Sequence, residues 1–574
     1  MTMKNIRILA GGCMAVSAIS GMYGQESLQK EITVEREIVP EVRAASRLNL
    51  YPRTLTFRQS PATLSFSELT EMADINPLLD TLEPASTGRA IPQTPYRGYA
   101  DVGYFPLANG SLSAGYAAVQ SESTRLNIWG EADNTDYKCR PVDEAEKMRM
   151  RRFAASAGID FSHSFGETGT FSASTSLTYN YFTRPDAAIA ESLGEMRQVS
   201  NRQNTFAWDL AAGWEKSGRY GVAYHAEARF GLMDFGHGIM AYENADAPVQ
   251  TKVKPAGERT FNLSLGFEKW LFSGGSLGEG SSFGADFSAD IAHNTGGWGT
   301  TTPGVLSITP YFRCIEGIVN LKAGVKLGFA LNSGKVLHIA PDVLFGVNPA
   351  SGFGAWIRVE GGEKVNTLRS LFEITPFISP VATYPTSGLP VKGDIGLRLG
   401  PVKGAALIVK ASYGMANRWL MPEAVDDRVV FVGHDLRGWK LSAEATWNYR
   451  SVVSLRAGYS GVIGEDDKQG WMEWRDRARH VVSAAVTVRP VAPFSIDLSY
   501  ELRMRRRMPM VGADGEMWCN LKDENRLNVG LAYRISDAFT VFARGENLLN
   551  CRSLLMPFVP SQGITGLVGV GVKF

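Results

Sequence analysis

The last eleven residues of the chain alternate between apolar side chains and small or polar ones. The apolar positions are Ile564, Val568, Val570, Val572 and Phe574. A period of two is typical of a strand with two unlike faces. A sheet can cross a membrane only if it closes on itself, because every backbone polar group must then be paired within the sheet. We therefore interpret this stretch as the closing strand of an outer-membrane β-barrel, with Phe574 at the periplasmic rim.

The same alternation recurs along the chain. In the stretch 494–505, apolar residues such as Phe494 and Leu498 alternate with polar residues such as Asp497 and Glu501. Charges confined to one face indicate that this face stays in water. A soluble sandwich would show the same pattern, but it needs a second apolar layer that the sequence does not supply. The pattern therefore predicts a sheet with a lipid-facing apolar side and a wet lumen.

About 22 such segments follow one another from residue 96 to the C-terminus, a number known for large membrane barrels. Tight turns such as 166–169 alternate with long connections such as 184–199, 362–388 and 415–436. Bacterial barrels combine short periplasmic turns with long outer loops and an even number of strands. We expect an all-β fold in which residues 96–574 form one transmembrane antiparallel barrel, with both chain termini in the periplasm.

The beginning of the chain is typical of a secretory signal. Lys4 and Arg7 precede a short apolar run, and small residues follow up to Gly24. We assign residues 1–24 to a signal peptide, because the run is too short to cross a membrane as a helix. A lipoprotein signal that uses Cys13 is the alternative, although no leucine stands three residues before Cys13.

Residues 25–95 carry mixed charge, many prolines and little periodicity. They predict an extended periplasmic arm. Within this arm a short alternating stretch consists of Ile32, Thr33, Val34 and Glu35. These four residues form a candidate docking strand that pairs with a periplasmic partner by strand addition. The alternative is that the arm folds into the lumen of its own barrel.

Bulk composition agrees with a two-faced barrel. The hydrophobic content of 44% and the mean hydropathy of −0.10 are averages over one apolar and one polar face. The net charge of +1 gives no indication of a nucleic-acid partner. The cysteines that follow the signal are Cys139, Cys314, Cys519 and Cys551. Their spacing matches no metal site, and disulfides and free thiols both remain open for an exported chain.

The C-terminal region is similar to a known family. Residues 539–550, ending in the motif Glu546–Asn550, and then Gln562, Gly563 and the final strand resemble the end of TonB-dependent receptor barrels. The resemblance implies an outer-membrane receptor or transport barrel for passage or uptake of a solute. Members of that family carry a large N-terminal plug, whereas only about 70 residues separate the signal from the first strand here. The chain therefore resembles the plugless receptor-like barrels of Bacteroidetes-type bacteria.

This resemblance also implies partners. We expect contacts with outer-membrane lipid and lipopolysaccharide, insertion by the barrel-assembly machinery, and docking of an energy-coupling or other periplasmic protein. The alternative function is a non-transporting scaffold or assembly subunit of an outer-membrane protein complex. No nucleophile–base pair and no metal-ligand spacing stands out, so we expect no catalysis, no cofactor and no metal.

Two basic clusters fall near predicted outer strand ends. Their members are Arg149, Arg151 and Arg152 in the first, and Arg503, Arg505, Arg506 and Arg507 in the second. Arginine binds phosphate and carboxylate groups well, so both clusters are candidate contacts for lipopolysaccharide or for an anionic solute. The alternative is that they are ordinary solvated charges of the loops and the lumen.

Overall fold

The computed structural model describes most of the chain from residue 96 onwards. The described ranges are 96–105, 109–139, 147–184, 202–218, 221–244, 247–271, 280–296, 299–332, 336–378, 384–425, 428–463, 478–512, 515–556 and 559–574. All of them belong to one compact unit, residues 76–574. The predicted signal peptide, the predicted arm and the stretch from Ile32 to Glu35 lie outside the described residues.

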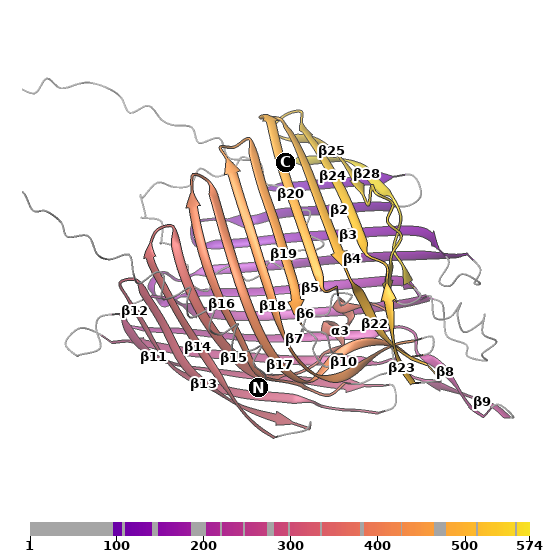
Figure 1. Cartoon of the computed structure of the whole chain (residues 1–574), viewed down its shortest axis with the longest axis horizontal. Coiled ribbons are helices and arrows are strands. Elements are labelled where there is room, and N and C mark those ends of the chain that lie inside the picture. The colour runs from indigo at the N-terminus through magenta and orange to yellow at the C-terminus, as the bar shows by residue number, and fades with distance from the viewer. Residues whose placement is uncertain are drawn as a thin grey trace, which may run out of the picture. The chain divides into compact units, whose positions relative to one another are not determined.

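An antiparallel barrel dominates this unit (Figure 1). Its 22 strands are β1 (Gly98–Phe105), β2 (Asn109–Gln120), β3 (Thr124–Cys139), β4 (Met148–Ser164), β5 (Thr170–Thr183), β6 (Arg202–Lys216), β7 (Val222–Phe235), β10 (Gly257–Trp270), β11 (Ser281–Thr295), β12 (Gly304–Glu316), β13 (Val319–Leu331), β14 (Leu337–Ala350), β15 (Phe353–Lys364), β16 (Ser387–Val402), β17 (Ala405–Val425), β18 (Arg428–Tyr449), β19 (Val453–Ile463), β20 (His480–Val491), β21 (Phe494–Met504), β24 (Glu524–Arg534), β25 (Phe539–Glu546) and β28 (Thr565–Lys573). Strand β28 pairs with both β25 and β1 and closes the ring. The predicted fold class is confirmed.

The two faces of the sheet have different chemistry. Val102 of β1 pairs with Val570 of β28 on the outer face, and both side chains are exposed, by 53% and 37%. One position away, Asp101 pairs with Gly571 on the luminal face. Apolar side chains left exposed on the outside of a closed sheet are suited to lipid. Separately, none of the helices in the described residues is long and apolar enough to cross a membrane.

The connections distinguish the two ends of the barrel. We call the end that carries Phe574 and tight connections such as 121–123 and 403–404 the turn rim, and the opposite end the loop rim. The loop rim carries the hairpins β8 (Ile239–Asn244)–β9 (Ala247–Val253), β22 (Arg506–Gly512)–β23 (Gly515–Leu521) and β26 (Leu554–Met556)–β27 (Val559–Pro560). It also carries α3 (Leu368–Ile374), whereas the 3-10 helix η1 (Gly166–Thr168) lies at the turn rim.

Aromatic rings gather at the turn rim, as at the water interface of membrane barrels. The ring of Phe574 stacks on Tyr116 at 6.4 Å between centroids. Phe165 stacks on Trp214 at 5.1 Å, and the hydroxyl of Tyr224 donates to the Thr168 carbonyl at 2.8 Å. These contacts form a belt that holds the short connections against the strands.

The loop predicted at 415–436 is wrong. The stretch 415–436 is not a long loop but the paired ends of β17 and β18, which are joined by residues 426 and 427. The register shifts between Ala416 and Trp419, and pairing then continues to the tip of both strands. This shift interrupts the period of two. Pro422 also lies inside the stretch, and a proline argues against a continuous strand when the sequence alone is considered.

Candidate functional site in the barrel lumen

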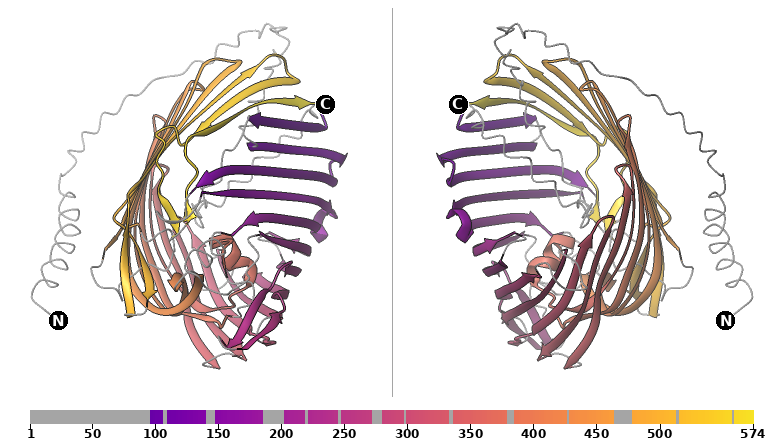
Figure 2. Two further views of the ribbon diagram at one scale, coloured as in Figure 1. Left: turned by 90° about the vertical axis from the view of Figure 1, so that its right-hand side faces the viewer. Right: turned by 90° about the vertical axis from the view of Figure 1, so that its left-hand side faces the viewer.

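The connection between β15 and β16 folds into the barrel instead of extending from its rim. We call residues 365–386 the inner segment; the structure describes it at 365–378 and 384–386. Figures 1 and 2 both show its helix, α3, inside the ring of strands. An element in that place controls how much of the lumen is free, so it is the natural candidate for a functional site.

Local sequence explains why a helix forms here. Thr367 accepts a hydrogen bond from the backbone amide of Ser370 at 3.0 Å, and the Ser370 hydroxyl accepts one from the Thr367 amide at 3.2 Å. This capping box satisfies two of the amides that a helix leaves unpaired at its start. The helix has only seven residues, so packing and not helix propensity must hold it in place. Its apolar residues Leu368 and Leu371 are each 2% exposed.

A carboxylate on the barrel wall binds the start of the helix. Glu258 of β10, which is 1% exposed, accepts hydrogen bonds from the backbone amides of Leu368 at 2.7 Å and Arg369 at 3.5 Å. These contacts satisfy two of the backbone amides that a helix leaves unpaired at its start. The side chain of Arg369 forms an ion pair with Asp209 of β6. Two strands of the barrel therefore anchor the helix, β10 through hydrogen bonds and β6 through an ion pair.

Aromatic packing adds a second anchor on the same arc of the barrel. Phe372 of α3 lies against Phe182 of β5 and Phe235 of β7, with ring centroids 5.7 and 6.2 Å apart. Arg184, which is 4% exposed, donates to the carbonyl oxygen of Ile378 at 3.1 Å. Strands β5, β6, β7 and β10 and the adjoining Arg184 therefore contact the inner segment from Leu368 to Ile378.

The second half of the inner segment contacts a different arc. The ring of Tyr384 meets the ring of Phe431 of β18 at 5.8 Å, and Leu420 of β17 belongs to the same buried cluster as Leu368. Burial raises the pKa of the Tyr384 hydroxyl, which keeps it neutral. Strands β11 to β16 separate the two arcs around the ring. The inner segment is therefore an apolar bridge across a corner of the lumen.

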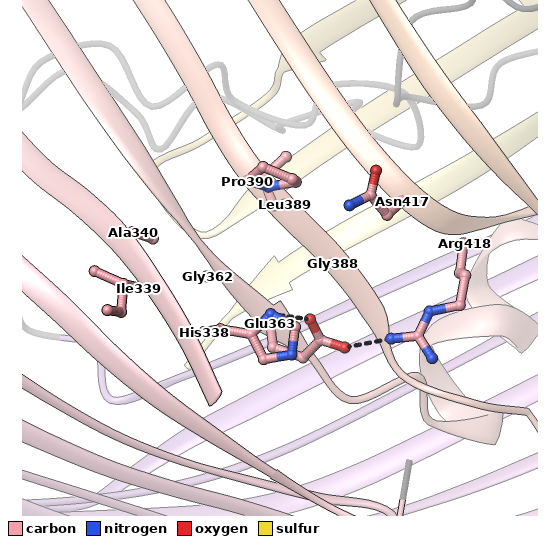
Figure 3. Close-up of a pocket in the computed structure, with 10 residues that line it drawn as sticks. All are labelled: His338, Ile339, Ala340, Gly362, Glu363, Gly388, Leu389, Pro390, Asn417 and Arg418. Atoms are coloured by element: carbon pink, nitrogen blue, oxygen red, sulfur yellow. Dashed lines mark hydrogen bonds and ion pairs between the residues drawn. The ribbon is translucent and has the colours of Figure 1, made fainter. Parts of the chain in front are cut away.

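A pocket of about 380 Å³ lies beside this bridge, between the loop-rim ends of β14 and β17 (Figure 3). Glu363 lines it with a fully buried side chain. Its carboxylate accepts from Thr386 Oγ1 at 2.6 Å and from Arg418 Nη2 at 3.1 Å, and His338 Nδ1 lies 3.3 Å away. The pocket therefore gathers charged side chains at the place where the inner segment rejoins the barrel.

Elsewhere the luminal wall is polar and internally paired. Lys322 forms an ion pair with Asp342 at 2.8 Å, and Arg313 with Glu268 at 3.3 Å. A second hollow of about 290 Å³ is lined mainly by serine and alanine residues, such as Ser172, together with the acidic residues Asp160 and Glu227. Within the described ranges, no three His, Cys, Asp or Glu side chains gather closely enough to hold a metal ion. The side chains of this part of the wall are therefore suited to contact with water in the lumen.

The predicted arginine clusters divide between different environments. Arg149 and Arg151 lie on the outer face near the loop rim, 51% and 45% exposed, and both contact Asp136, at 2.6 and 3.4 Å. Arg152 occupies the opposite face of the same strand. Of the first cluster, Arg149 and Arg151 therefore lie together on the outer face, and Arg152 is separated from them.

The second cluster is mostly structural. Arg503, which is 7% exposed, contacts Glu524 at 3.2 Å, and Arg506, which is 1% exposed, donates to the Lys522 carbonyl at 3.1 Å. Arg505 is exposed and Arg507 half-buried. The buried pair holds the base of the β22–β23 hairpin, and the structure does not bring it together with Arg149.

Sequence reasoning missed the inner segment, because 362–388 was predicted to be an outer loop. A signal was present: Thr367 and Ser370 have capping spacing, and Leu368, Leu371 and Phe372 give an apolar helical face. A solvated loop does not need such a face.

Comparison of the sequence with protein-family models gives no match, and comparison with curated proteins gives none. Solved structures do match in fold. The siderophore receptor PirA from Acinetobacter baumannii has a TM-score of 0.61 at 8% identity, over 83% of this chain and 80% of that one. The ferric enterobactin receptor PfeA from Pseudomonas aeruginosa, in complex with enterobactin, has a TM-score of 0.59 at 9% identity, over 83% and 81%.

The ferripyoverdine receptor of the outer membrane of Pseudomonas aeruginosa gives a TM-score of 0.60 at 10% identity, over 85% of this chain and 73% of that one. Identities this low carry no information about ligands. What the likeness establishes is the fold, a closed 22-strand transmembrane barrel of the kind found in these receptors.

Proposed function

We propose that this chain is an outer-membrane barrel that passes or takes up a solute through its lumen, and that the inner segment narrows this path. The observation that carries the proposal is the bridge itself: buried Glu258 binds the start of α3, and Tyr384 packs on the opposite arc. An ordered element that is attached to two separate arcs of the wall reduces the free cross-section of the lumen (Figure 2).

Orientation and partners follow from this proposal. The turn rim and both termini face the periplasm, and the loop rim faces outward. Arg149 and Arg151, exposed on the outer face near the loop rim, contact lipopolysaccharide phosphates, and the barrel-assembly machinery inserts the barrel. Ile32, Thr33, Val34 and Glu35 dock a periplasmic or energy-coupling protein. The neighbours in fold support a receptor or transport role and not an enzymatic one, since those proteins receive ferric enterobactin and ferripyoverdine.

Planar-bilayer conductance tests the path. The mature chain should show a small, stable conductance. A variant in which residues 368–378 are replaced by a Gly–Ser linker of equal length should conduct several times better. The matched control replaces the β8–β9 hairpin in the same way, since among the described residues those two strands form a sheet of their own. The proposal fails if the segment variant and the wild type conduct equally.

The second candidate is a scaffold or assembly subunit of an outer-membrane complex. The same bridge favours it, because an apolar cluster inside the lumen also serves a barrel that never opens. A chain that stays silent with and without the inner segment, and that copurifies with fixed partners, fits the scaffold. Deletion of 32–35 tests coupling: uptake that is unchanged by the deletion removes the energised version of transport.

A further inference from the structure

We propose that the pocket between β14 and β17 binds a small organic anion through a carboxylate group. The inference rests on the proposed function, since it makes this pocket a binding site for the solute on its path through the lumen. Four features carry it: the excess of basic side chains, an unused amide, a floor made of glycine, and contact with the inner segment.

Basic groups outnumber acidic ones around the pocket. Glu363 is the acidic side chain in its lining, and it faces Arg418 at 3.1 Å and His338 at 3.3 Å. Lys326 adds a third basic group: its Cδ lies 3.1 Å from where a Cβ on Gly362, a lining residue, would be. Within the part of the chain that the structure describes, the Lys326 ammonium has no ion-pair partner. Outside the lining, Asp435 accepts from the Arg418 backbone amide at 3.0 Å. Within the pocket region, one buried carboxylate faces two permanently charged side chains, Arg418 and Lys326.

Donors remain available to a ligand. The Arg418 side chain is 37% exposed, and a single nitrogen, Nη2, contacts Glu363. The Asn417 amide lines the pocket and makes no hydrogen bond among the described residues. The free edge of the Arg418 guanidinium matches the planar geometry of a carboxylate. The buried charge of Glu363 nearby disfavours a phosphate, which concentrates up to two negative charges on one group, so a carboxylate, with a single charge on the group that binds, is the better fit.

Glycines keep the pocket open. A Cβ on Gly388 would lie 3.0 Å from Oε2 of Glu363, and one on Gly361 would lie 2.8 Å from the Ala340 side chain. Gly362 has a φ of +145°, which side chains rarely adopt. The resulting volume of about 380 Å³ is at the lower end of ordinary ligand sites, so the ligand is small.

The pocket also touches the inner segment. Thr386, at its end, donates to Glu363 at 2.6 Å, and the adjacent Ser387 donates to the Arg418 carbonyl at 2.8 Å. A carboxylate that binds Arg418 competes with Glu363 for the guanidinium. The ligand therefore sits where the bridge is attached to the wall, which is the place for a solute that travels past the bridge.

Isothermal titration of the full mature chain in detergent tests the site, with succinate as the anion and succinamide as its uncharged analogue. Succinate should bind saturably and succinamide should not. K326Q, which removes a charge without exposing a buried acid, should weaken succinate binding by about ten-fold. The paired variant E363Q/R418Q removes the guanidinium together with the acid it neutralises, and it should abolish binding.

The matched control is K410Q, the same Lys→Gln change at a lysine on β17. Lys410 lies eight residues before Arg418, which is roughly 26 Å along the strand towards the turn rim. It should bind succinate as the wild type does. Heat-modified mobility on gels verifies that each variant is folded. The inference is overturned if wild-type binding is absent, if succinamide binds equally well, or if K326Q and E363Q/R418Q bind like K410Q.

Conductance of the same preparations separates the two proposals: a conducting barrel without succinate binding refutes only the pocket, and a binding barrel without conductance refutes the passage.

Discussion

Glu258 and Leu368 lie 110 residues apart in the chain, and the carboxylate of the first accepts a 2.7 Å hydrogen bond from the backbone amide of the second. This contact ties the inner segment to the barrel wall at a point that solvent does not reach, since Glu258 is 1% exposed. It defines the attached state of the bridge and indicates where the attachment can be broken.

Replacing Glu258 by alanine should release the start of α3. The amides of Leu368 and Arg369 would lose their acceptor, at a cost of about 1–3 kcal/mol to the attached state. We expect larger and noisier single-channel conductance with the barrel still folded, as judged by heat-modified mobility on gels. Glu258→Gln keeps one acceptor oxygen and should be intermediate. Identical recordings for both variants and the wild type would show that the contact does not hold the bridge.

A charge swap tests the second attachment. Arg369 and Asp209 form an ion pair with side chains that are 31% and 37% exposed, so their coupling should be modest, at about 1 kcal/mol or less. D209R or R369D alone should place like charges together and raise the conductance. The double variant D209R/R369D should return it towards the wild-type value. A double variant that conducts as much as the singles would refute direct pairing.

The strands were predictable because each carries its own signal. Alternation in a stretch such as 494–504 reports which face meets lipid, and no distant residue is needed to interpret it. The number and order of strands therefore follow from the sequence. The paired ends of β17 and β18 did not, because the register shift after Ala416 breaks the period of two where the pairing continues.

The candidate site could not be predicted in the same way. Its bridge depends on Glu258 meeting Leu368 and on Tyr384 meeting Phe431, contacts between arcs of the ring that a local pattern does not encode. The basic clusters were visible in the sequence, but burial of Arg503 and Arg506 depends on the β22–β23 hairpin. Composition reveals the charge, and only the fold decides whether solvent reaches it.

The cysteines give a chemical test of the fold. Cys139, Cys314 and Cys551 are free thiols in the structure, at the end of β3, near the turn-rim end of β12 and in the connection after β25. We expect an alkylating reagent to label all three in denaturant without prior reduction, as read by peptide mass spectrometry. Labelling that requires a reductant would mean that the exported chain forms a disulfide and that one of these connections is arranged differently.

Two adjacent residues of β21 test which side of the sheet meets lipid. Leu498 pairs with Val486 and Val529 on the outer face and is 39% exposed, whereas Ser499 faces Asn528 across the lumen side. Leu498→Arg places a charge near the middle of the spanning strand and should cost about 2–4 kcal/mol. Ser499→Arg places the same charge in a wet lumen and should cost less than about 1 kcal/mol.

Urea-dependent unfolding in lipid vesicles, followed by tryptophan fluorescence, measures the free energy of unfolding of both variants. Because the substitutions introduce the same side chain one residue apart, the depth of the introduced charge is matched. Equal costs, or a larger cost at Ser499, would place lipid on the wrong side of this sheet and overturn the barrel.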